Sequence, residues 1–199
     1  MAQDPAYTLP TYTRAARRYH WWIAALIVAQ IPLGLYMTYR GKHMPGVNDK
    51  GEPITGVWDA LTGLLYSSHK LLGVVILLLV VGRVVYRVTR GAPPPDPSLP
   101  PILRVASHVV HGAIYVLLLA VPLIGYVGTS YYGALNVFGI PFPAVTAKDE
   151  KFSEQVFELH EAAAMLLAAL VVAHIGAALF HKFIRKDRIV ERMIPKRSA

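Results

Sequence analysis

Residues 159–181 read LHEAAAMLLAALVVAHIGAALFH and place His160 and His174 in one long apolar run. With its flanks the run covers residues 156–183, more than the ~20 residues that a helix needs to cross a bilayer. The two histidines are 14 residues apart, so on a helix they lie about 21 Å apart and within about 40° of one face. An ionisable side chain inside a membrane span is costly and marks a functional site. The run therefore predicts a membrane helix with functional histidines at two depths.

Three further apolar segments, at about 19–39, 65–88 and 105–130, have the length of membrane helices. The chain of 199 residues is 54% hydrophobic and only 16% charged, whereas soluble domains carry about a quarter charged residues. We therefore expect an all-α fold, a transmembrane four-helix bundle that forms a single domain over residues 1–199. The first apolar segment is too long for a signal-peptide core, so we expect it to remain as the first helix.

Basic residues predict the orientation of the helices. The N-terminus, the proline-rich connection RGAPPPDPSLPP (90–101) and the C-terminus carry, with their flanks, 14 Lys and Arg residues, and the remaining connections carry 6. The positive-inside rule places both termini and this proline-rich connection in the cytoplasm of a multi-pass membrane protein. The other side carries 8 of the 12 acidic residues and is slightly acidic. The net charge of +8 thus reflects membrane orientation and contact with lipid rather than nucleic-acid binding.

Depth pairs the four histidines that lie inside the spans. The first helix runs outward and the second runs inward, so His20 lies near the inner face with His174, and His69 lies near the outer face with His160. The chain has no cysteine, which excludes thiolate ligation and covalent haem attachment. Two imidazoles fill both axial positions of a haem iron, which then transfers electrons rather than binding oxygen. The histidines predict two non-covalent haems, with buried or cavity-lining histidines as the alternative.

Basic side chains near the two predicted haem levels are candidate partners of the haem propionates. At the inner level they are Arg17, Arg18, Arg83 and Arg87, and at the outer level the candidate is Lys70. Simple snorkelling of the arginines to the membrane interface explains them at least as well.

Three more histidines lie near the cytoplasmic ends of the spans. His108 and His111 open the third span, and His181 follows His174 by seven residues. Imidazoles exchange protons near neutral pH, so these side chains are candidates for a quinone site. Two alternatives stay open for these three histidines. They are equally well explained as interfacial polar residues at a helix end, and one of the three could replace His20 as a haem ligand.

Small residues and prolines accompany the histidines. Gly73 lies one turn after His69 and Gly176 lies close to His174, and glycine lets a flat macrocycle or another helix approach the backbone. Pro32 and Pro122 lie inside spans and are expected to kink them.

The chain resembles the bacterial cytochromes b561 over its whole length. The similarity is carried by short motifs in a shared order, which are RRYHWW (17–22), SHKLLG (68–73), HVVH (108–111), LHE (159–161), AH (173–174), LFHK (179–182) and MIPKR (193–197). The resemblance implies two b haems, with His69 and His160 on the outer one and His20 and His174 on the inner one, and electron exchange with ubiquinone.

Several functions follow from this resemblance. We expect electron transfer between a periplasmic donor and membrane ubiquinone, and some members of the family are superoxide:ubiquinone oxidoreductases. Whether the protein is an enzyme depends on its donor, because a protein donor would make it the haem-bearing anchor subunit of a respiratory dehydrogenase or hydrogenase. The sequence departs from the family in its long outer loop GKHMPGVNDKGEPITG (41–56) and in its acidic outer face. A surface that attracts an anion such as superoxide should be locally positive, so the acidic face weakens that function. A four-helix transporter or metal-binding membrane protein is the alternative from another class.

Overall fold

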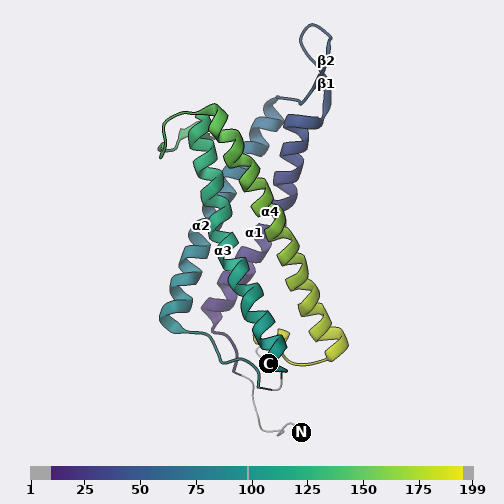
Figure 1. Ribbon diagram of the computed structural model, residues 1–199, viewed down its shortest axis with the longest axis vertical. Helices are drawn as coiled ribbons and strands as arrows, with labels where there is room; N and C mark the ends of the chain where they lie inside the picture. Colours follow the sequence, from purple (N-terminus) through teal and green to yellow (C-terminus); the bar gives the residue numbers. More distant parts are fainter. Residues whose placement is uncertain (1–9, 98, 195–199) are drawn as a thin grey trace.

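The computed structural model describes residues 10–97 and 99–194 and consists of four long helices in an up-and-down bundle (Figure 1). The helices are α1 (Arg14–Thr38), α2 (Ala60–Arg90), α3 (Pro101–Tyr132) and α4 (Glu150–Leu179). By length and composition, all four can cross a membrane. The predicted all-α, four-helix membrane fold is confirmed.

Each helix begins before its predicted apolar segment, because residues that cap the helix, rather than the limits of hydrophobicity, set where it begins. The Thr13 side chain accepts from the Ala16 N–H, Asp59 accepts from Thr62, and Asp149 accepts from Phe152. A side-chain oxygen at this position satisfies a backbone donor that has no partner inside the helix. The helix α3 begins instead with a proline, Pro101, whose missing N–H needs no partner there.

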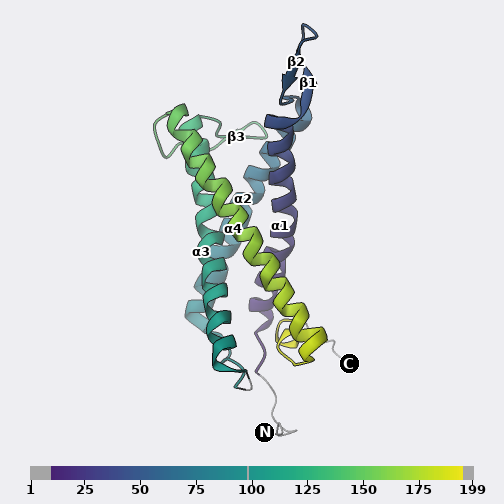
Figure 2. The same ribbon diagram turned by 45° about the vertical axis from the view of Figure 1, so that its right-hand side comes forward.

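The bundle consists of two helical hairpins. Helix α1 packs along α2, α3 packs along α4, and α2 joins the two hairpins through α3. In Figure 2, α4 crosses the bundle obliquely, from α3 at the outer end toward α1 at the inner end. The buried core is apolar, and its members are Ile23, Ile27, Ile76, Val80, Leu118 and Leu167. Many other large apolar side chains of the spans are exposed, among them Val28, Leu78, Val116 and Val172, and these would contact lipid in a membrane.

Two small hairpins lie at the outer end. After the π-helical turn η1 (Tyr39–His43), strands β1 (Pro45–Val47) and β2 (Pro53–Thr55) pair antiparallel and project beyond the bundle (Figure 1). Between α3 and α4, strands β3 (Asn136–Val137) and β4 (Ile140–Pro141) form the second hairpin.

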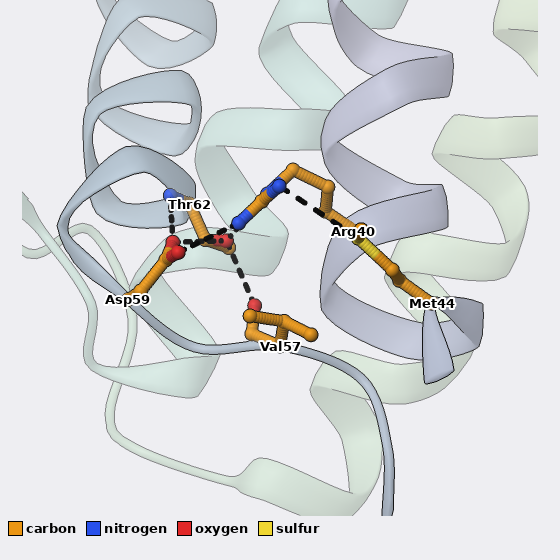
Figure 3. Close-up of polar contacts among 5 residues, drawn as sticks. All are labelled: Arg40, Met44, Val57, Asp59 and Thr62. Atoms are coloured by element: carbon orange, nitrogen blue, oxygen red, sulfur yellow. Dashed lines mark hydrogen bonds and ion pairs between the residues drawn. The ribbon is translucent and has the colours of Figure 1, made fainter. Parts of the chain in front are cut away.

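The first hairpin is held at its base by a polar cluster (Figure 3). The Arg40 guanidinium forms an ion pair of 2.7 Å with Asp59 and donates through Nε to the Thr62 hydroxyl at 3.1 Å. That hydroxyl in turn donates to the Val57 carbonyl at 2.7 Å. The cluster therefore ties the end of α1 to the start of α2.

Contacts at the opposite end join the N-terminal segment, the proline-rich connection and the C-terminal segment. Arg192, in the short helix η3 (Val190–Arg192), donates to the Pro10 carbonyl at 2.9 Å and to the Pro94 carbonyl at 2.8 Å. The three regions counted as cytoplasmic thus share one end of the bundle. The charged residues Asp4, Lys196 and Arg197, together with the end of the MIPKR motif, lie outside the described residues.

Candidate functional site

Two histidine rings face each other near the outer end of the bundle. The ring centroids of His69 on α2 and His160 on α4 are 6.1 Å apart, and the ring planes are 84° apart. Two metal–imidazole bonds of about 2 Å, together with the radii of the two rings, span about 6 Å. The spacing therefore fits one metal ion held between the two imidazoles.

The ring of His160 is oriented by helix α3. Its Nδ1 donates to the main-chain carbonyl of Val121 at 2.9 Å. A Cβ atom on Gly125, one turn further along, would lie 2.9 Å from Nδ1 and 3.7 Å from Nε2. The Nδ1 edge thus faces α3 and carries the hydrogen, which leaves the Nε2 lone pair free to bind a metal.

Helix α1 approaches His69 in a similar way. A Cβ atom on Gly34 would lie 3.0 Å from Cε1 of the ring, 3.3 Å from Nδ1 and 4.0 Å from Nε2. In both rings of the outer pair, then, the Nδ1 edge lies against a glycine of the neighbouring helix. Nε2 is in each case the nitrogen turned away from that helix.

A second pair lies near the inner end. The ring centroids of His20 on α1 and His174 on α4 are 6.2 Å apart, with planes 78° apart. His111 on α3 also contacts His174, at 5.1 Å between centroids, and its Nδ1 bonds to the Ser107 carbonyl at 2.6 Å. The longer separation is the one that fits an interposed metal ion. The geometry therefore favours His20 over His111 as the partner of His174.

Arg83 lies at the inner level on α2. Its Nε donates to the Tyr115 hydroxyl at 2.7 Å, and the guanidinium groups of Arg83 and Arg87 lie 5.6 Å and 5.7 Å from the centre of the Tyr115 ring. The Nη1 atom of Arg83 is buried and has no hydrogen-bond partner among the described residues. A buried guanidinium nitrogen without a partner fits an anionic group such as a haem propionate.

The other predicted basic residues have different surroundings. Arg17 donates to the Ile194 carbonyl at 3.1 Å, and Arg18 is exposed on α1. Lys70 donates to the carbonyls of Ala134 at 3.0 Å and Asn136 at 2.6 Å, in the connection between α3 and α4. The Lys70 ammonium thus fastens that connection to the outer end of α2.

The two remaining histidines of the predicted quinone site lie apart from the paired rings. The Nδ1 of His108 bonds to the Arg104 carbonyl of its own helix at 2.8 Å. His181, in the π-helical turn η2 (Phe180–Arg185), bonds to the Asp187 carboxylate at 2.6 Å. Of the three candidates, His111 is the one whose ring contacts His174.

Sequence reasoning chose different glycines from those that contact the histidines. A Cβ atom on Gly73 would lie 3.7 Å from Gln30, and one on Gly176 would meet nothing within 4 Å, whereas Gly34 and Gly125 lie against the rings. A repeated spacing of 14 residues in the sequence could have identified Gly34 and Gly125. It separates His160 from His174, and it recurs once on each other helix, as His20 to Gly34, His69 to Arg83 and His111 to Gly125.

The arrangement of the histidines differs from that of a site in which three or more side chains bind one metal ion. Within residues 10–97 and 99–194, no three His, Cys, Asp or Glu side chains gather in a group that could hold a metal ion. The histidines instead form two pairs at two depths, which is the arrangement that two axial ligands of a haem require.

The chain is similar in sequence to known cytochromes. The family model for prokaryotic cytochrome b561 matches residues 11–196. Cytochrome b561 homolog 2 of Escherichia coli (strain K12) is 30% identical over 183 residues, which cover 91% of this chain and 89% of that protein. Cytochrome b562 of Cereibacter sphaeroides is 27% identical over 188 residues, covering 94% and 98%. The probable superoxide oxidase CybB of Yersinia pestis is 28% identical over 130 residues, covering 65% and 74%.

Proposed function

Because the chain belongs to the prokaryotic cytochrome b561 family, we propose that it is a di-haem cytochrome of the bacterial inner membrane that transfers electrons between an outer-face donor and membrane ubiquinone. Family membership makes it a membrane electron carrier that binds b-type haem. The number of haems, their ligands and the two redox partners are the proposal.

The two histidine pairs carry this proposal. His69 and His160 hold one haem in the outer leaflet, and His20 and His174 hold the other in the inner leaflet, with ring separations of 6.1 Å and 6.2 Å. A bound haem with two imidazole ligands supplies one-electron oxidation and reduction and has no open position for oxygen. Because α4 provides a ligand at both levels, the two ligand positions, His160 and His174, lie about 21 Å apart along that helix.

The chain's own residues fix the ligands and balance charge. The Val121 carbonyl holds the hydrogen of His160 on Nδ1, so that Nε2 remains the ligand. Arg83 offers its partnerless Nη1 to a propionate of the inner haem. His111, in contact with His174, is placed to exchange a proton with a quinone at the inner level.

The donor at the outer face has two candidate classes. Superoxide is one, since a relative is named as a probable superoxide oxidase. A redox protein or dehydrogenase subunit is favoured by the charge, because this face carries 8 acidic and 6 basic residues. One of those basic residues, Lys148, forms an ion pair of 2.7 Å with Glu150. The side-chain hydrogen bond with Glu150 raises the pKa of Lys148. An acidic outer face attracts a basic protein better than an anion.

Spectroscopy of the purified protein tests the haem proposal. We expect a reduced b-type absorption band and two haems per chain, and absence of the band would refute the haem reading altogether. Quinone reduction under a flux of superoxide then separates the donors. A rate that exceeds the uncatalysed one supports superoxide, and co-purification of a stoichiometric dehydrogenase supports the subunit role.

A further inference from the structure

The outer pair of histidines is supported unequally. The Nδ1 atom of His160 donates to the Val121 carbonyl, but the Nδ1 atom of His69 is buried and has no hydrogen-bond partner among the described residues. A histidine that binds a metal through Nε2 carries its hydrogen on Nδ1, and that N–H is almost always bonded to an acceptor. If His69 is a ligand, as the proposed function requires, an acceptor should lie beside it.

Gln30 on α1 carries a side-chain oxygen of the kind required. Its Nε2 donates to the main-chain carbonyl of His69 at 2.9 Å, so its amide already lies against that residue. Its Oε1 is also buried and has no hydrogen-bond partner among the described residues. An amide oxygen only accepts, and an imidazole N–H only donates, so the two unpartnered atoms are complementary.

The position of Gln30 repeats the arrangement around His160. Gln30 lies four residues before Gly34, and Val121 lies four residues before Gly125. Residues four apart share one face of a helix. On both α1 and α3, a glycine lies against the Nδ1 edge of the ring, and the residue one turn before that glycine has a group that can accept a hydrogen bond. On α3 the acceptor is a main-chain carbonyl, and on α1 it is a side chain.

We propose that Gln30 is a positioning residue for the outer haem. Its Oε1 accepts a hydrogen bond from the Nδ1–H of His69 and thereby helps to set the reduction potential of that haem. This inference rests on the proposed ligation by His69. An acceptor on Nδ1 makes an imidazole more basic and stabilises the oxidised metal. The acceptor for His160 is the main-chain carbonyl of Val121, which a substitution does not remove. The proposed acceptor for His69 is the side chain of Gln30, which a substitution can remove.

The test is a redox titration of the two haems in the full-length holoprotein. We expect Gln30→Leu, which keeps the size but removes the acceptor, to raise the potential of the outer haem. Gln30→Glu, which offers a stronger and charged acceptor, should lower it. A tenfold change in the preference for ferric over ferrous haem corresponds to about 59 mV for one electron. The inner haem should keep its potential in both variants and serves as an internal reference.

Gln155 provides the matched control, since it is exposed on α4. Gln155→Leu should leave both potentials unchanged, and the low-spin ferric EPR signal of the outer haem should change in the Gln30 variants alone. If Gln30→Leu loses the outer haem, the Gln30→Glu variant decides whether Gln30 has this role. A lowered potential of the outer haem in that variant supports the role, and an unchanged potential contradicts it.

The outcomes separate this inference from the proposed function. A wild-type protein with no outer haem overturns the ligation by His69 and the role of Gln30 together. A wild-type protein with both haems, whose outer potential responds to neither Gln30 variant, overturns the role of Gln30 alone.

Discussion

Gly125 and the ring of His160 are so close that a Cβ atom on the glycine would lie 2.9 Å from two ring atoms. Real Cβ atoms essentially never approach so closely, so Gly125→Ala must displace the imidazole or separate α3 from α4. We expect the outer haem to be bound at least tenfold more weakly, in line with losses of support around metal ligands. The ratio of haem to protein after purification measures this.

Gly112 on the same helix supplies the control, because a Cβ atom there would meet nothing within 4 Å. Gly112→Ala should keep both haems, since alanine is favoured over glycine in a helix by up to about 1 kcal/mol. Equal haem content in the two variants would show that contact with Gly125 does not position His160.

The pairing by depth predicts which haem each ligand variant loses. His69→Ala should remove the outer haem and keep the inner one, and His174→Ala should do the reverse, because the two rings belong to different pairs. Each variant should therefore fall from two haems per chain to one. Loss of both haems, or of neither, in an otherwise folded protein would contradict the pairing.

His111 tests the choice of ligand at the inner level. Its ring lies 5.1 Å from that of His174, whereas the His20 ring lies 6.2 Å away, at the separation that an interposed iron needs. We expect His20→Ala to lose the inner haem and His111→Ala to keep it, by haem content and absorption spectrum. The reverse result would make His111 the ligand.

Much of this architecture was predictable from the sequence. Apolar length predicted four membrane helices, and the depth of His69 and His160 predicted that they would meet, as the structure shows. The glycines were missed for a physical reason. We sought room for a haem on the ligand's own helix, at Gly73, whereas the ring is accommodated by the neighbouring helix, at Gly34. Which helices are neighbours is decided by packing, not by local pattern.

The surroundings of Lys70 show a second limit. Its charge and place beside His69 predicted a partner for a propionate, but its ammonium bonds to carbonyls of a connection 64 and 66 residues further along the chain. Those carbonyls are available because Gly133 ends α3 in the left-handed conformation and the chain turns there into β3. Such a contact depends on the path of a loop, which residue type alone does not specify.

Thr62 is the buried centre of the outer polar cluster, with no exposed surface. Its hydroxyl joins the Arg40 guanidinium to the Val57 carbonyl. Thr62→Val keeps the shape but leaves both groups without this partner, which we expect to cost about 1–3 kcal/mol of unfolding free energy. Thr62→Ser retains the hydroxyl and should lose less. Thermal unfolding of the two variants in detergent measures the difference, and equal midpoints would show that the hydroxyl contributes nothing.

Asp59 makes the same cluster sensitive to acid. The N–H of Thr62 donates to its carboxylate, and this bond, with those from the Thr62 hydroxyl and Arg40, holds the pKa of Asp59 below its ordinary value. A carboxyl with a lowered pKa in the folded state stabilises the fold fully above its unfolded pKa of about 3.9, and this contribution is lost as the pH falls through the folded pKa. Asp59→Asn keeps a capping oxygen but cannot titrate. We therefore expect the wild-type unfolding midpoint to fall more steeply below about pH 4 than that of Asp59→Asn. Parallel pH profiles for the two proteins would mean that Asp59 does not link this cluster to acid stability.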